Sequence, residues 1–206
     1  MNLPNKLTIA RLALTVIFLM VFFCPMPFPE TLARLAPFRE TLALALFLVA
    51  GITDFFDGRI ARRDRLITNF GILMDPLADK ILICSAFIAF VGRDLMPAWM
   101  VALIVARELA ITGLRLLAAA RNVVLAAEGC GKHKTTSQMV AIVSILVMIS
   151  YPPWGSWART VFEFRVLGGP WVVWFTEATK WVAVFFTVLS GVLYLRRNRS
   201  LYLQDL

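Results

Sequence analysis

Long apolar runs alternate with short polar or proline-containing segments along most of this chain. The runs predict six membrane-spanning helices, at roughly 7–24, 41–61, 74–92, 97–120, 135–151 and 172–195. Each run approaches the roughly 18–20 residues that a helix needs to cross the hydrocarbon core of a bilayer. Turns such as PMPFP, MPAW and YPPWGS separate several runs, and residues 152–170 are expected to form a connector. The pattern predicts an all-α integral membrane protein with one domain over residues 1–206.

The basic residues are distributed unevenly between the ends of these predicted helices. With six spans both termini lie on one side of the membrane. That side holds most of the basic residues, namely Lys6, Arg11, Arg59, Arg62, Arg63, Arg65, Arg115, Arg121, Lys132, Lys134, Arg196, Arg197 and Arg199. Because cytoplasmic loops carry the excess of Lys and Arg, both termini are predicted to be cytoplasmic. A bacterial inner membrane fits a short chain without a targeting extension.

Composition supports a membrane protein. Apolar residues make up 60% of the chain, the mean hydropathy is +0.77 and the net charge is +8. In a soluble protein this charge would suggest nucleic acid, but in a membrane protein basic side chains contact anionic lipid head groups. We therefore expect membrane lipids as partners and no nucleic acid. The three cysteines lack the spacing of a metal site or a disulfide framework.

Four aspartates interrupt the apolar pattern in the segment DFFDGRIARRDRLITNFGILMDPLAD, residues 54–79. Asp54 and Asp57 fall near the end of the second predicted span, and Asp75 and Asp79 near the start of the third. The predicted topology brings all four to one depth, near the cytoplasmic surface. Because an α-helix turns by about 100° per residue, each pair of aspartates shares one face of its helix.

Four clustered carboxylates beside a bilayer have to be protonated or to bind cations. Their oxygens suit Mg²⁺ or Mn²⁺, and two such ions balance the four charges. Gly58 and Ala61 lie on the face of Asp54 and allow a ligand to approach the helix, while Arg62 offers a bidentate donor for phosphate. Metal-assisted phosphoryl transfer is one interpretation of this arrangement. Spacing alone leaves two others open, a proton or cation path and structural pairing with the arginines.

The spacing of these residues resembles a known family signature. The pattern is Asp54-x2-Asp57-Gly58-x2-Ala61-Arg62-x8-Gly71-x3-Asp75-x3-Asp79. It is similar to the signature of the CDP-alcohol phosphotransferases, which displace CMP from a CDP-linked alcohol with an acceptor hydroxyl, and every fixed position is filled. The resemblance implies two divalent cations, Mg²⁺ or Mn²⁺, bridged by Asp54 and Asp75, with Asp57 on one ion and Asp79 on the other.

The same resemblance implies roles for other residues. Asp79 would also act as general base on the acceptor hydroxyl, cytidine would lie against Gly58 and Ala61, and Arg62 would balance the charge of the leaving CMP. The family also suggests a homodimer. Together with the six predicted spans, this leads us to expect helices arranged around a polar cavity that opens to the cytoplasm.

Three further segments resemble one branch of the family, the phosphatidylglycerophosphate synthases, which join CDP-diacylglycerol to glycerol 3-phosphate. They are LPNKLTIAR at 3–11, ARELAITGLR at 106–115 and GKHKTTSQM at 131–139. In similar proteins the start of the first span helps to bind the CDP-lipid, which makes Asn5 and Thr8 candidates, and Thr68 is a further candidate. A helix cap is the alternative for Asn5 and Thr8.

An acceptor that carries a phosphate needs a cationic pocket beside the carboxylates. Arg107 and Arg115 lie about 80° apart on the fourth predicted span, and Lys132 and Lys134 precede the fifth. We expect these four residues to bind the acceptor phosphate, although the two lysines would also serve to anchor a span end at the interface. Pairing of Arg107 with Glu108 is disfavoured, because adjacent residues on a helix do not face each other.

The predicted reaction is transfer of the phosphatidyl group of CDP-diacylglycerol to glycerol 3-phosphate, with release of CMP. Cardiolipin, phosphatidylinositol-phosphate and phosphatidylserine synthases are the alternatives within the family. Outside the family, the alternative is an ion-conducting membrane protein that uses the aspartates as a cation path. In the last predicted span, Glu177 and Lys180 are spaced i, i+3 and are expected to pair.

Overall fold

The computed structural model describes residues 3–23, 36–64, 69–120, 130–166 and 168–199. Within these ranges it describes only the backbone at 3–5, 7, 54–64, 69–76, 79, 120 and 130–132. In the described part of the chain, six helices of at least 21 residues coincide with the six predicted apolar runs. They are α1 (Leu3–Phe23), α2 (Arg39–Asp64), α3 (Asn69–Val91), α4 (Ala98–Ala120), α5 (Cys130–Ser150) and α7 (Trp171–Arg197). The prediction of a mainly helical protein is confirmed.

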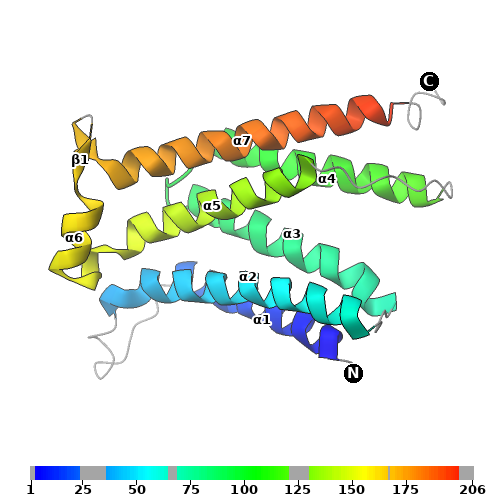
Figure 1. Cartoon of the computed structure of the whole chain (residues 1–206), viewed down its shortest axis with the longest axis horizontal. Helices are drawn as coiled ribbons and strands as arrows, with labels where there is room; N and C mark the ends of the chain where they lie inside the picture. The colour runs from blue at the N-terminus through cyan, green and yellow to red at the C-terminus, as the bar shows by residue number, and fades with distance from the viewer. Residues whose placement is uncertain (1–2, 24–35, 65–68, 121–129, 167, 200–206) are drawn as a thin grey trace.

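The helices form an elongated bundle in which α1 packs against α2 and α3, α5 against α2 and α7, and α4 against α3 and α7 (Figure 1). Helix α1 begins and α7 ends at the same end of the bundle. The last turns of α2 and the first turns of α3 also lie at this end, which we call the terminal end.

The opposite end of the bundle carries the connector between α5 and α7. It contains a 3-10 turn (Pro152–Trp154), α6 (Ser156–Phe162), and the antiparallel strands β1 (Arg165–Val166) and β2 (Gly169–Pro170). The chain can turn sharply at two points in this segment, between the 3-10 turn and α6 and between β1 and β2, because Gly155 and Gly168 have φ of 101° and 85°, values that glycine adopts readily. The connector therefore has a structure of its own, which hydrophobic periodicity did not predict.

Arginine and glutamate side chains hold the starts and ends of three helices together at this end. Arg39, the first residue of α2, donates from Nε to the Val21 carbonyl and from Nη2 to the Phe22 carbonyl, both at 2.6 Å. These carbonyls belong to the last turn of α1 and have no partner within the helix. Arg93, after α3, lies over the Phe22 ring and pairs with Glu40 at 3.4 Å.

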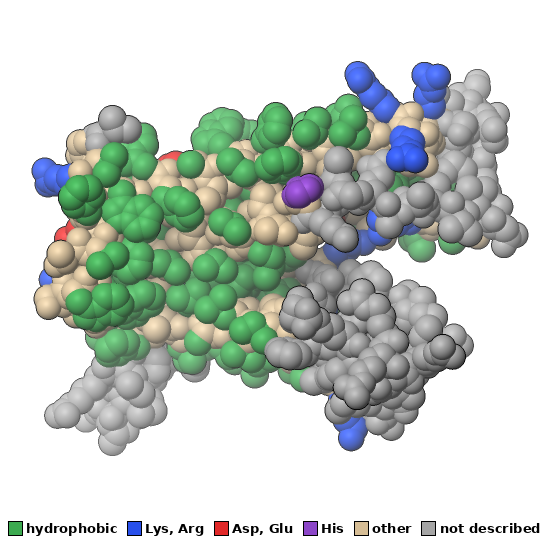
Figure 2. Space-filling view, viewed as in Figure 1, with side chains coloured by type: hydrophobic (Ala, Val, Ile, Leu, Met, Phe, Trp, Pro, Cys, Tyr) green, Lys and Arg blue, Asp and Glu red, His purple; other side chains and the backbone are tan. Residues whose placement is uncertain are grey.

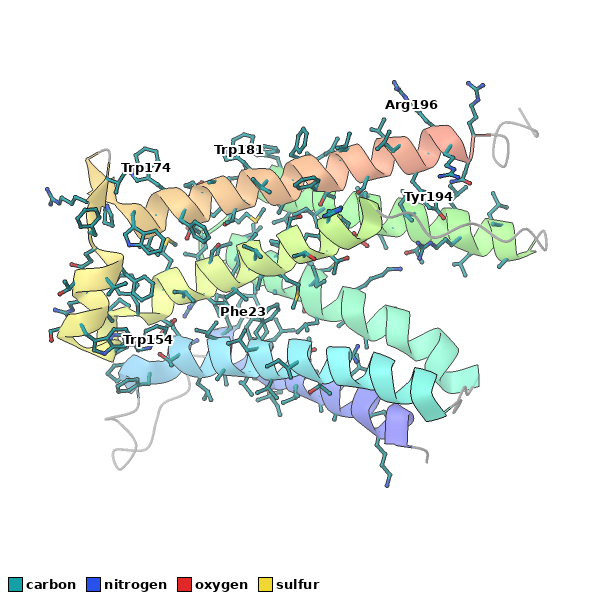
Figure 3. All side chains as sticks on the ribbon, viewed as in Figure 1. Phe23, Trp154, Trp174, Trp181, Tyr194 and Arg196 are labelled. Atoms are coloured by element: carbon teal, nitrogen blue, oxygen red, sulfur yellow. The ribbon has the colours of Figure 1, made fainter. Side chains whose placement is uncertain are left out.

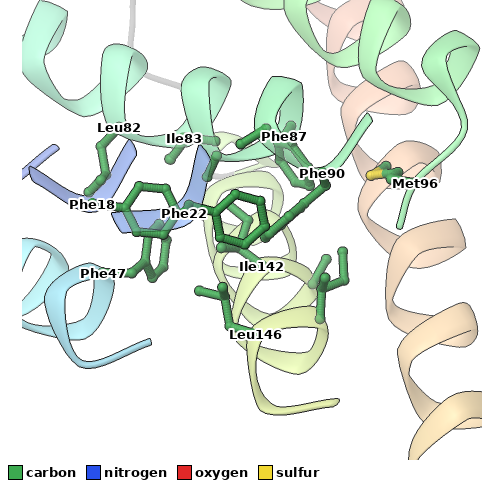
Figure 4. Packing of buried hydrophobic residues seen from close by; sticks show 14 of the residues in the cluster. Phe18, Phe22, Phe47, Leu82, Ile83, Phe87, Phe90, Met96, Ile142 and Leu146 are labelled. Carbon is green, nitrogen blue, oxygen red and sulfur yellow. The ribbon is translucent and has the colours of Figure 1, made fainter. Parts of the chain in front are cut away.

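Phenylalanine rings fill the space between α1, α2 and α3 (Figure 4). Phe22 meets Phe90 edge to face at 5.7 Å between ring centroids, and Phe18 lies 5.9 Å from Phe47. All four rings are buried, with at most 1% of their surface exposed. Within a bilayer, helices associate through close van der Waals packing, since lipid tails are as apolar as the helix surfaces. This ring cluster therefore positions α2 and α3 relative to α1.

Hydrogen bonds between small polar side chains join α5 to α7. Gln138 donates to the Thr187 hydroxyl at 3.0 Å, and the hydroxyls of Ser144 and Thr179 are 2.7 Å apart. All four residues are buried. Interhelical bonds of this kind contribute about 0.6–2 kcal/mol each in membrane proteins. They hold α5 and α7 in one register along their length.

The outside of the bundle is apolar, as Figure 2 shows for one face. Leu109, Leu116 and Phe185 each expose more than 60% of their surface. Within the described residues, Ala36–Thr53 and Trp171–Arg197 are each long and apolar enough to cross a membrane. These features fit a protein whose exterior contacts lipid. The count of six spans and the polar cavity stay predictions.

The ring cluster generates a stability prediction. Phe22→Ala should cost about 3 kcal/mol, because the bundle cannot collapse fully into the space that the ring leaves. At about 2–4 °C per kcal/mol for a chain of this size, the melting temperature in detergent should fall by about 6–12 °C. Phe185→Ala removes a ring that is 62% exposed and is the control, with an expected change of under about 2 °C. An equal fall in melting temperature in the two variants would contradict the burial of Phe22 in the ring cluster.

Candidate active site

The four motif aspartates lie on the two helices that the sequence predicts for them. Asp54 and Asp57 are in the C-terminal half of α2, and Asp75 and Asp79 are in the N-terminal half of α3. Only four residues connect Asp64 to Asn69, so these helix ends are at most about 18 Å apart. The last turns of α2 and the first turns of α3 lie at the terminal end of the bundle (Figure 1).

Several predicted site residues fall outside the side chains that the structure describes. They are Asn5, Asp54, Asp57, Gly58, Ala61, Arg62, Asp75, Asp79 and Lys132, and Thr68 lies outside the described residues altogether. Their mutual geometry therefore stays a prediction. The described part of α1 does bear on Thr8, which is the sixth residue of that helix and 1% exposed. Thr8 lies inside α1, so the helix-cap alternative does not hold for it.

Two of the predicted acceptor-binding cations meet at one carboxylate. Glu108 Oε1 accepts hydrogen bonds from Arg107 Nη1, at 3.3 Å, and from Lys134 Nζ. The side chains of Arg107, Glu108 and Lys134 are 14%, 8% and 8% exposed. The expectation that Arg107 and Glu108 do not pair is wrong. The rule for adjacent residues describes the direction of the Cβ atoms, whereas the long arginine side chain reaches back to the carboxylate.

A glycine on α7 makes room for Arg107. A Cβ atom added at Gly191 would lie 2.9 Å from Arg107 Cγ. Since Cγ is close to the backbone of α4, that contact would not be relieved by moving only the end of the arginine side chain. The absence of a side chain at Gly191 thus allows α4 and α7 to approach closely where Arg107 is placed.

Further polar groups surround this charged cluster. Lys80, the residue after Asp79, donates to the Thr112 hydroxyl, which in turn donates to the Glu108 carbonyl at 2.7 Å. Closer to the end of α4, Arg115 Nε donates to the Tyr194 hydroxyl at 3.4 Å, and Tyr194 lies between α7 and α4 (Figure 3). Sequence reasoning missed Lys80, Glu108 and Tyr194. The one signal for Lys80 was a charge beside Asp79 in an apolar run.

The described side chains therefore bring the predicted acceptor-binding residues together only in part. Arg107 and Lys134, from α4 and α5, share Glu108, whereas Arg115 contacts Tyr194 instead. Among the described side chains of this cluster, Lys80, Arg107 and Lys134 carry three positive charges and Glu108 carries one negative charge. A buried group with excess positive charge attracts an anion, and Lys and Arg are the side chains that bind phosphate.

Comparison with known sequences identifies the class of protein. Residues 1–189 match the family described as CDP-alcohol phosphatidyltransferase. The chain belongs to this family, so the resemblance drawn from the aspartate motif is confirmed.

Individual relatives are more specific. The chain is 42% identical, over 96% of its length and 95% of the relative's, to the CDP-diacylglycerol–glycerol-3-phosphate 3-phosphatidyltransferase of Bacillus subtilis. It is 36% identical, over 98% and 97%, to the protein of the same name in Rickettsia bellii. It is also 41% identical, over 73% and 68%, to a probable phosphatidylglycerophosphate synthase of Mycobacterium tuberculosis.

The shared carboxylate generates a prediction about stability. Glu108→Gln leaves Arg107 and Lys134 buried without their anion, which should cost about 3 kcal/mol and lower the melting temperature in detergent by about 6–12 °C. Lys134→Met leaves the neutral Arg107–Glu108 pair and should cost less than half as much. The double variant Glu108→Gln/Lys134→Met should melt above Glu108→Gln alone, because one uncompensated cation is gone. A larger loss in Lys134→Met than in Glu108→Gln would contradict the shared pairing.

Proposed function

We propose that this chain transfers the phosphatidyl group of CDP-diacylglycerol to glycerol 3-phosphate, releasing CMP and forming phosphatidylglycerophosphate. The observation that carries the proposal is the 42% identity, over nearly the full length of both chains, to a relative whose name states these two substrates. The segments 3–11, 106–115 and 131–139 support the same branch of the family.

Asp54, Asp57, Asp75 and Asp79 would hold two divalent cations, Mg²⁺ or Mn²⁺. Two facts support the fit. Carboxylate oxygens are the ligands that these ions take, and the two pairs of aspartates lie in the adjoining halves of α2 and α3, which are joined by four residues. Four carboxylates near a bilayer also need compensating charge. The cations would neutralise the negative charge on the pyrophosphate oxygens during transfer.

The reaction would be a direct displacement in which the chain's own residues bind, orient and move a proton. Asp79 would take the proton of the acceptor hydroxyl, and that oxygen would attack the phosphorus linked to diacylglycerol. The bond from this phosphorus to the CMP phosphate oxygen would break, and Arg62 would balance the charge that develops on CMP. No serine, cysteine or histidine nucleophile is needed.

The substrate sites would lie on either side of the carboxylates. Gly58 and Ala61 would leave space for cytidine, and Asn5, Thr8 and Thr68 would complete the CDP-diacylglycerol site. Arg107, Arg115, Lys132 and Lys134 would bind the acceptor phosphate. This last assignment is supported by the convergence of Arg107 and Lys134 and by the excess of positive charge among the described side chains around them.

The membrane arrangement that fits this chemistry has six spans, both termini in the cytoplasm and a polar cavity open to that side. The chain would form a single domain over residues 1–206, act as a homodimer and reside in a bacterial inner membrane. The start of α1 and the end of α7 lie at the same end of the bundle (Figure 1). This supports the topology, because an even number of spans returns the chain to its starting side. Exposed Arg196 and Arg197 at the end of α7 fit a cytoplasmic terminus.

Release of CMP from CDP-diacylglycerol tests the activity and its metal dependence. Purified protein in detergent should release CMP with glycerol 3-phosphate, only when Mg²⁺ or Mn²⁺ is present, and EDTA should abolish release. Asp79→Asn should lower the rate by at least about 100-fold, because it removes a general base and a metal ligand. Asp94→Asn is the control, since Asp94 follows α3 at the other end and has φ of 57°, which asparagine tolerates.

The same assay separates the alternatives. It is run in parallel with serine, inositol phosphate and phosphatidylglycerol as acceptors. Release only with one of these would keep the mechanism and change the acceptor. No release with any acceptor, from protein that melts cooperatively, would contradict the proposal, and cation flux in liposomes would then support the ion-path alternative.

The acceptor site generates a second kinetic prediction. Arg115→Gln should raise the KM for glycerol 3-phosphate by about tenfold, with kcat and the KM for CDP-diacylglycerol changed by less than about twofold, because only acceptor binding is lost. Arg196→Gln, which removes an exposed charge near the end of α7, is the control. An unchanged acceptor KM in Arg115→Gln would show that Arg115 does not bind the acceptor phosphate. Arg107, Lys132 and Lys134 would then be the remaining candidates.

A further inference from the structure

Glu108 is a buried acid to which the proposed mechanism assigns no role. It lies in the middle of α4 with its side chain 8% exposed. Its Oε1 atom accepts from Lys134 on α5 and from Arg107 on α4, and its backbone carbonyl accepts from Thr112. A carboxylate in such a place loses its hydration, so a gain elsewhere has to offset that cost.

The geometry leaves much of both cations available to a ligand. Glu108 uses one of the three N–H donors of Lys134 and one Nη atom of Arg107. Among the described residues, Arg107 Nε is buried without a hydrogen-bond partner. One carboxylate oxygen therefore holds the two cations side by side while most of their donors remain uncommitted to it.

Charge explains why a carboxylate is needed at this point. Two cations brought together in an apolar bundle repel each other and lose their hydration. Without an anion between them, they would separate or one would lose its proton. Counting Lys80, which is linked to Glu108 through Thr112, the described side chains of this cluster carry three positive charges and one negative charge, a net +2. That charge complements a phosphate dianion.

We propose that Glu108 is a positioning residue of the acceptor site, which keeps Arg107 and Lys134 charged and adjacent so that the phosphate of the acceptor meets a preformed pair. This inference rests on the proposed function, because it deepens the role of the acceptor site. A purely structural role is the competing account. The two accounts differ in the KM for the acceptor, since KM does not depend on how much of the enzyme is folded.

The kinetic test compares Glu108→Gln and Glu108→Asp with the unaltered protein. Glu108→Gln should raise the KM for glycerol 3-phosphate by about tenfold or more and leave the KM for CDP-diacylglycerol within about twofold. Glu108→Asp keeps the charge on a shorter side chain and should raise the acceptor KM by a smaller factor, about threefold. Glu177→Gln is the matched control, because Glu177 also accepts from a buried lysine, Lys180 on α7, at 2.6 Å. It should leave both KM values unchanged.

A binding measurement separates this inference from the proposed activity. Calorimetric titration of each purified protein with glycerol 3-phosphate and with inorganic phosphate should show weaker binding in Glu108→Gln, by a factor similar to the change in KM. If the unaltered protein releases no CMP but binds phosphate in a manner that depends on Glu108, the proposed activity fails and the positioning role stands. If it binds neither probe, the positioning role is overturned.

Three other outcomes would also overturn the inference. They are an unchanged acceptor KM and Kd in folded Glu108→Gln, tighter binding in that variant, which would mean that Glu108 competes with the phosphate, and an equal change in Glu177→Gln. If Glu108→Gln does not fold, Glu108→Asp decides the question: a rise in the acceptor KM supports the positioning role, and an acceptor KM equal to that of the unaltered protein rejects it.

Discussion

A charge inside an apolar helical bundle has to be neutralised by a nearby opposite charge, because neither lipid tails nor aliphatic side chains replace its hydration. Among the described side chains, Lys180 meets this requirement with Glu177, whereas Arg107 and Lys134 share Glu108 and meet it only in part. The four motif aspartates face the same requirement with the sign reversed. One physical constraint thus accounts for the paired side chains and also gives the reason to expect cations at the aspartates.

The packing of the bundle determines where these charged side chains lie. The phenylalanine cluster holds α2 and α3 against α1. It therefore helps to position the two helices that carry the aspartates. The hydrogen bonds from Gln138 and Ser144 to α7 fix α5, which carries Lys134 one turn before Gln138. Contacts between neighbouring helices therefore decide where these charged groups lie.

Much of this fold was predictable, because the apolar runs are long. The last predicted span, 172–195, differs from α7 by one residue at its start and two at its end. The family was predictable because the aspartate segment fills every fixed position of the family signature that it resembles, whereas helical periodicity alone left three interpretations open. The connector was not predictable in the same way, because its short helix and strands depend on turns at Gly155 and Gly168 rather than on periodicity. The Arg107–Glu108 pair was missed because residue spacing describes Cβ directions and not the reach of a long side chain.

Gly191 also has a consequence for how sequences of this kind can diverge. A methyl group at position 191 would lie 2.9 Å from Arg107 Cγ, an atom that moves only if the whole arginine side chain turns about χ1. The two positions are therefore coupled in their evolution: a chain with a larger residue at 191 must carry a shorter or differently oriented side chain at 107, or separate α4 from α7. Among related chains, the sizes of the residues at positions 107 and 191 should therefore vary together, which can be checked from sequences alone.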